Sequence, residues 1–106
     1  MNYVKTSIGE LPVNYGHFAL SQFSTMTGIS MNDVFSMDLN KLSYEHIMTF
    51  LYIGLKDGAR KEKVECKVAG VEAFCDLADD NKDLINELFT IFASYRKGEG
   101  RGDKKK

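Results

Sequence analysis

Two cysteines and two histidines, Cys66, Cys75, His17 and His46, are the side chains best suited to bind a transition metal. Structural zinc sites draw their ligands from closely spaced Cys or His pairs, and these four residues form no such pair. Two thiols at this separation are more typical of small apolar core residues than of a disulfide bond or a redox motif. The sequence therefore predicts no metal site.

Acidic side chains gather at Asp76, Asp79, Asp80 and Asp83, a density that invites comparison with a calcium site. An EF-hand loop places its ligands in a set order and closes with a bidentate glutamate, and these residues do neither. Helix capping and solvation account for the cluster, because aspartate is a favoured N-cap residue.

Acid–base and phosphate chemistry find equally little support. His46 follows Glu45 and His17 begins a predicted helix, but neither has a nucleophile or a second acid at a recognisable spacing. The stretch Gly54-Leu-Lys-Asp-Gly58 has two glycines and a lysine without the spacing of a Walker phosphate loop. We predict that this stretch marks the end of a helix. Since no catalytic motif is found, we also predict that the protein is not an enzyme.

The charge balance argues against a nucleic-acid partner. The 14 basic and 15 acidic residues give a formal net charge of −1 and are well mixed up to the last few positions. Phosphate backbones are bound by clustered Lys and Arg, and the body of the chain has no such cluster. It also has no apolar run near the length of about 18 residues that a membrane span needs, and residues 1–7 do not resemble a signal peptide. We expect a cytosolic protein with no nucleic-acid or membrane partner.

The 106 residues, 43% of them hydrophobic, suffice for one compact core. Residues 3–14 should be extended, because Val4, Thr6 and Ile8 alternate, Gly9-Glu10 can turn, and residues 11–13 can return as an edge strand. Apolar residues at helical spacing then predict a helix from Tyr15 to Met26, ended by Gly28.

Ser30 can cap a short helix that carries Met31, Val34 and Phe35 and ends before Asn40. Ser43 can cap the next helix, over 44–55, which is apolar on nearly all sides and is therefore predicted to be the central helix of the domain.

Gly54 on the central helix would allow another backbone to approach closely, and Asp57-Gly58 should end the helix. Residues 60–67 are predicted to be extended or a loop, followed by a helix to about Ala78.

The last helix, capped by Asp80, carries an apolar stripe from Leu84 to Tyr95 and should close at Gly98. The predicted fold class is mainly α: a small bundle of four to five helices with a short N-terminal β-hairpin or extended segment. We assign residues 1–97 to this single helical domain and 98–106 to a disordered basic tail.

Methionine and aromatic side chains are the best candidates for a partner-binding surface, because flexible thioethers and large rings adapt to apolar partners. Met37 and Tyr52 fall off the main apolar stripes and are predicted to be exposed. A role in the core is the more common one for such residues. The candidate partner-binding residues are Met37, Met48, Tyr52, Phe92 and Tyr95.

The order of these features resembles the tail assembly chaperones of long-tailed bacteriophages and prophages. An extended Leu11-Pro12-Val13 precedes a helix that contains residues 18–23, and Thr27-Gly28-Ile29-Ser30 is similar to the "tG-s" break of that family. Leu51-Tyr52-Ile53-Gly54-Leu55-Lys56 looks like its "LLyaGLk" signature, followed by Gly58-Ala59-Arg60. The resemblance covers most of the chain, from about Ile8 to Tyr95.

The resemblance implies that the protein binds the long tape-measure protein and keeps it soluble while tail-tube subunits polymerise around it. It implies no enzymatic activity and no cofactor, a partner in the tape-measure protein, and location in the host cytoplasm rather than in the mature virion. It leaves open whether the tail tube protein is a second partner. It leaves a homo-oligomer open and carries over no set of binding residues. Gly70 and the Lys-rich tail depart from the pattern of the family.

Two other classes of function remain open at this point. A structural tail or head–tail connector subunit would be retained in purified virions, whereas a chaperone would be absent from them. A DNA-binding helix-turn-helix needs a basic recognition helix, and the segments 18–26 and 44–55 carry almost no Arg or Lys.

Overall fold

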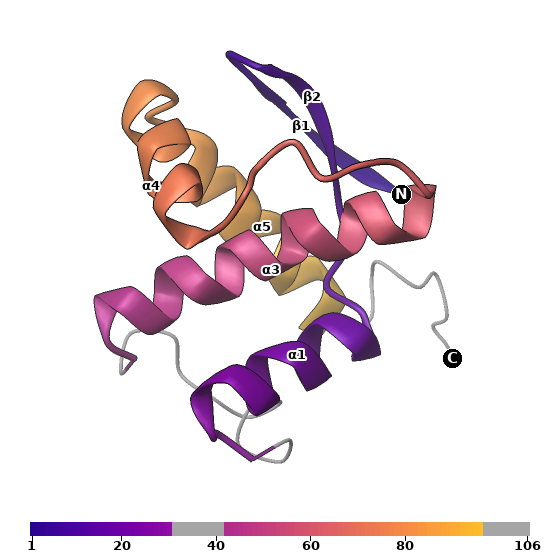
Figure 1. Cartoon of the computed structure of the whole chain (residues 1–106), viewed down its shortest axis with the longest axis vertical. Helices are drawn as coiled ribbons and strands as arrows, with labels where there is room; N and C mark the ends of the chain where they lie inside the picture. Colours follow the sequence, from indigo (N-terminus) through magenta and orange to yellow (C-terminus); the bar gives the residue numbers. More distant parts are fainter. Residues whose placement is uncertain (31–41, 97–106) are drawn as a thin grey trace.

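The computed structural model describes residues 1–30 and 42–96, which form a two-stranded antiparallel hairpin and four helices (Figure 1). In chain order the elements are β1 (Asn2–Thr6), β2 (Gly9–Val13), α1 (His17–Thr27), α3 (Tyr44–Glu62), α4 (Val71–Asp80) and α5 (Leu84–Arg96). This confirms the predicted helical bundle with an N-terminal hairpin. The short helix expected before Asn40, the candidate Met37 and the tail 98–106 lie outside the described residues.

The hairpin pairs Val4 with Leu11 and Asn2 with Val13, so that Val4, Leu11 and Val13 share its buried inner face. Its turn is Ser7-Ile8, and the expected turn at Gly9-Glu10 is wrong, because Gly9 already begins β2. The Thr6 hydroxyl stabilises this turn by donating to the Gly9 carbonyl at 2.7 Å and accepting from the Ile8 amide at 3.2 Å. Local side-chain bonding thus shifts the turn towards the N-terminus.

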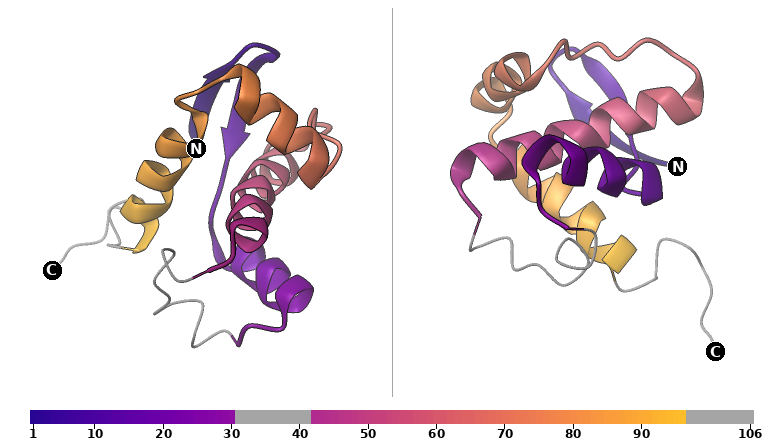
Figure 2. Two further views of the ribbon diagram at one scale, coloured as in Figure 1. Left: turned by 90° about the vertical axis from the view of Figure 1, so that its left-hand side faces the viewer. Right: turned by 60° about the horizontal axis from the view of Figure 1, so that its bottom comes forward.

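Helix α3 is the central element, as predicted. The Ser43 hydroxyl accepts a hydrogen bond from the His46 amide at 3.1 Å and caps it. The helix contacts α1, α4, α5 and β2. Strand β2 lies along α3 and β1 lies nearest α5, so that the hairpin stands between the two helices (Figure 2).

Gly54 and Gly58 lie one turn apart on α3, at the place where the chain leaving β2 crosses it. The Asn14 amide donates to the Gly54 carbonyl at 3.0 Å. A Cβ on Gly54 would stand 2.2 Å from Cζ of Tyr15, and one on Gly58 would stand 2.3 Å from the carbonyl oxygen of Pro12. The two glycines therefore let a strand end and an aromatic ring rest directly on the helix backbone.

The predicted end of this helix at Asp57-Gly58 is wrong. Helix α3 continues to Glu62 and ends at Lys63, which adopts the left-handed conformation at φ 60°. Gly58 lies within the helix, where its missing Cβ leaves room for the backbone of β2. By contrast, Gly28 ends α1 at φ 79°, as expected.

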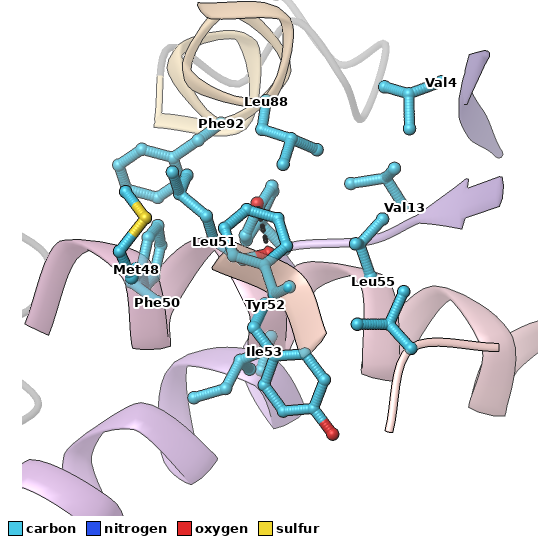
Figure 3. Close-up of a cluster of buried hydrophobic side chains, with 14 of the residues drawn as sticks. Val4, Val13, Met48, Phe50, Leu51, Tyr52, Ile53, Leu55, Leu88 and Phe92 are labelled. Carbon is cyan, nitrogen blue, oxygen red and sulfur yellow. Dashed lines mark hydrogen bonds between the residues drawn. The ribbon is translucent and has the colours of Figure 1, made fainter. Parts of the chain in front are cut away.

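Aromatic rings fill the core around this crossing. The ring of Tyr15 stacks on Phe50 with centroids 5.0 Å apart, and Phe50 meets Phe92 and Phe23 edge-to-face at 4.7 and 5.1 Å. The Tyr15 hydroxyl donates to the Leu51 carbonyl at 3.1 Å, which satisfies the polar atom of a buried ring. Figure 3 shows α3 and α5 contributing side chains to this one cluster.

The boundaries around α4 differ from prediction by a few residues. Helix α4 starts at Val71 because Gly70 occupies its N-cap, and it runs on to Asp80. Asp80 is thus the last residue of α4 rather than the cap of α5, and the Leu84 amide donates to the Asn81 carbonyl at 2.9 Å in the turn between them. Within residues 1–30 and 42–96, no helix combines the length and the apolar character of a membrane span.

We predict that Gly58→Ala lowers the free energy of unfolding by about 2 kcal/mol, the usual cost of forcing an extra methyl group into packed surroundings. The methyl group would meet the backbone of Pro12, which cannot rotate away, and this outweighs the better helix propensity of alanine. Urea unfolding followed by circular dichroism measures the change.

Gly70→Ala is the matched control, because a Cβ at that residue meets nothing within 4 Å. Its free energy of unfolding should fall by less than about 1 kcal/mol, because the cost is limited to alanine being a poorer N-cap residue than glycine. A Gly58→Ala variant as stable as this control would contradict the close contact between the backbones of β2 and α3.

Candidate functional site

The structure places most of the predicted partner-binding residues in the core. Met48 and Phe92 are each 3% exposed, and Tyr52 is 8% exposed. Figure 3 shows the Met48 side chain reaching toward Phe92. Tyr95 is partly buried, and its hydroxyl donates to Oδ1 of Asn14 at 2.7 Å. These four side chains therefore pack in the interior of the domain and do not form a partner-binding surface.

The predicted exposure of Tyr52 is therefore wrong. The residue lies off the main apolar stripe, but α3 is covered on several sides, so the stripe does not decide which side chains reach solvent. Burial raises the pKa of the Tyr52 phenol, and negative charge on the nearby Cys66 side chain raises it further.

A polar network joins four segments around Asn14. Its Nδ2 donates to Oδ2 of Asp57 at 2.7 Å, while the Nε of Arg60 donates to Oδ1 of Asp57 at 2.8 Å. The Arg60 guanidinium also lies 4.3 Å from the centre of the Phe18 ring, a cation–π distance. Because both oxygens of the buried Asp57 accept hydrogen bonds, this carboxylate acts as a structural group that ties α1, α3, α5 and the end of β2 together.

The cysteines and the acidic cluster form no metal site in the part of the chain that the structure describes, where no group of three or more His, Cys, Asp or Glu could hold an ion. Cys66 and Cys75 are partly buried free thiols that pack against the core. The Cys66 thiol donates to the Val68 carbonyl at 3.3 Å.

A groove with an apolar floor lies beside the hairpin. It is bounded by the hairpin, by the C-terminal end of α3 and by the segment that follows α3, and its volume is about 360 Å³. We call it the hairpin groove. Its lining residues are Tyr3, Glu10, Leu11, Pro12, Leu55, Ala59, Glu62, Val64, Glu65, Cys66 and Lys67.

Two large apolar side chains stand half-exposed at the hairpin groove. Tyr3 is 45% exposed and Val64 is 55% exposed, while Leu11, Leu55 and Ala59 form a buried floor. Single exposed apolar residues are ordinary in soluble proteins, but a ring and an aliphatic side chain over a shared apolar floor can hold the side chains of a partner.

The rim of the hairpin groove is acidic. Glu10, Glu62 and Glu65 line it together with a single cation, Lys67. The Tyr3 hydroxyl donates a hydrogen bond to Glu62, which raises the pKa of the phenol, and slight burial and the charges of Glu62 and Glu10 raise it further.

Sequence reasoning did not find this groove. The alternation in β1 could have identified Tyr3, because it points away from the face that holds Val4. Val64, Glu62 and Glu65 carried no such signal, since residues 60–67 were predicted only to be extended or a loop, which does not place their side chains.

Comparison with protein-family models, curated proteins and solved structures gives no match to this chain.

We expect Asn14→Ala to lower the free energy of unfolding by about 1–3 kcal/mol, because an oxygen of buried Asp57 and the Tyr95 hydroxyl would each lose a partner. Thermal and urea unfolding measure the loss. The control is Asn86→Ala on the exposed surface of α5, which should be close to neutral. Equal effects of the two substitutions would show that the Asn14 network contributes no stability.

We predict that Glu62→Gln lowers the pKa of Tyr3 towards the ordinary value of about 10, because it removes the carboxylate that favours the protonated phenol. The hydrogen bond of the phenol stabilises the fold below the unfolded-state pKa, and this contribution is lost as pH rises through the higher folded-state pKa. NMR titration of the tyrosine ring carbons follows Tyr3 directly. Glu72→Gln on α4 is the control, and a Tyr3 titration equally changed by both variants would refute the Glu62 contact.

Proposed function

We propose that this protein is a phage tail assembly chaperone, which binds the tape-measure protein and keeps it soluble while the tail tube assembles. The observation that carries the proposal is the hairpin groove, an apolar depression flanked by the half-exposed side chains of Tyr3 and Val64. The proposal involves binding without a catalytic step or a cofactor. It places the protein in the host cytoplasm during assembly and outside the finished virion.

The residues that carry the resemblance to this family have definite structural roles, which supports the proposal. Gly28 of the Thr27-Gly28 break ends α1 in the left-handed conformation. Gly54 of the Leu51–Lys56 signature is the residue on which the Tyr15 ring rests. A family pattern that retains these glycines would preserve the same crossing of strand end and helix.

The physics of the partner also suits the surface. A tape-measure protein is a long helical chain with apolar stripes, and an amphipathic helix can place apolar anchors into a groove of this kind. Phe18, Met26 and Tyr44 are further apolar side chains that are 47%, 55% and 70% exposed. Such scattered, flexible contacts suit a chaperone whose client offers many similar segments.

We predict that co-expression with the longest coiled-coil-rich open reading frame encoded nearby keeps that long protein soluble and that the two proteins elute together. The physical reason is that the chaperone covers apolar stripes which otherwise aggregate. The soluble fraction of the long protein is measured with and without this chain, and with an unrelated helical protein of similar size as the control.

Purified particles give the complementary readout. A chaperone is absent from them, whereas a structural tail or head–tail connector subunit is retained. If the long protein precipitates regardless of co-expression and this chain is found in finished particles, the structural-subunit interpretation replaces the chaperone one.

A further inference from the structure

We propose that the hairpin groove binds a helical segment that presents a basic side chain, Arg or Lys, next to an apolar one. This inference rests on the proposed function for the identity of the partner, but the chemistry of the occupant follows from the groove itself.

The first argument is charge. Three carboxylates, of Glu10, Glu62 and Glu65, and one ammonium group, of Lys67, line the groove, and 1 − 3 gives its lining a net charge of −2. Lys61 and Lys63 alternate with these glutamates along the chain but are not among the described residues that line the groove. The chain as a whole has a formal net charge of only −1, so the groove concentrates negative charge locally.

The second argument is the shape of the cationic side chains. Lys and Arg lay an apolar stem along an apolar surface and keep the charged head at its polar edge. Here the floor of Leu11, Leu55 and Ala59 would contact the stem, and the carboxylates of Glu62 and Glu65 at the rim would receive the head. The half-exposed ring of Tyr3 adds a face for cation–π contact, of the kind that Arg60 already makes with Phe18 within this domain.

The third argument concerns the apolar neighbour. Val64 is 55% exposed beside the same floor, and a volume of about 360 Å³ can take more than one side chain. A helix presents residues three or four positions apart on one face, so a Leu and an Arg at that spacing would fill the floor and reach the rim together. An acidic segment would be repelled, and a purely apolar one would bury carboxylates without partners.

The test uses a capped, Ala- and Gln-rich helical peptide with one Leu and one Arg four residues apart, titrated into the full-length protein. Its matched control replaces the Arg by citrulline, which keeps the shape and removes the charge. Affinity is measured by fluorescence anisotropy, and the site is located by NMR shifts of Tyr3, Val64 and Cys66.

We expect the Arg peptide to shift the NMR signals of these three residues. It should bind up to about fivefold more tightly than the citrulline peptide, which is the upper end of what exposed ion pairs supply. The double variant Glu62→Gln/Glu65→Gln should weaken binding of the Arg peptide by a similar factor and leave binding of the citrulline peptide unchanged. Asp76→Asn/Asp79→Asn, an equal loss of charge on exposed positions of α4, should change neither.

Equal affinity for the two peptides would overturn the proposal. So would NMR shifts at residues far from the hairpin, or shifts explained entirely by the protein associating with itself. The peptide assay contains no tape-measure protein, so the two proposals fail separately. If the peptide does not bind but co-expression keeps the long protein soluble, the client binds elsewhere on the chaperone. If the peptide binds but the long protein still precipitates, the chaperone role is refuted.

Discussion

The fold depends on one close crossing, where the chain leaving the hairpin passes over the central helix at two glycines. Gly54 and Gly58 remove the Cβ atoms that would otherwise hold Tyr15 and the Pro12 carbonyl away from α3. Glycine inside a helix costs about 1 kcal/mol relative to alanine, and here the contact it permits offsets that cost. The crossing sets where the hairpin sits, and therefore where the hairpin groove lies.

The same crossing also positions the side chains of the polar network around Asn14. With Asn14 held on the Gly54 carbonyl, its side chain can reach both Asp57 and Tyr95, which belong to different helices. The Tyr15 ring is then placed among Phe50, Phe92 and Tyr95. Four consecutive residues, 12–15, thereby connect the hairpin, α3 and α5. The side chains of Asn14 and Tyr15 both have hydrogen-bond partners in these helices.

A rigid frame of this kind suits the binding role that we propose. The hairpin groove is built between elements that the crossing holds in place, yet its rim consists of exposed side chains that can adjust to a partner. The polar network around Asn14 and the carboxylates at the rim of the hairpin groove are different sets of residues. Substitutions can therefore address one without removing the other.

Local patterns in the sequence determined the hairpin, the helix that Gly28 ends, the Ser43 cap and the central position of α3, because strand alternation, helical periodicity and capping act over a few neighbouring residues. The tertiary structure alone decided that Gly58 continues a helix, that Tyr52 is buried, and that Tyr3 and Val64 flank a groove. A glycine that ends a helix and a glycine that admits a neighbouring backbone look the same in a sequence. What distinguishes them is a contact with Pro12, more than forty positions earlier in the chain, and only the folded chain brings the two together.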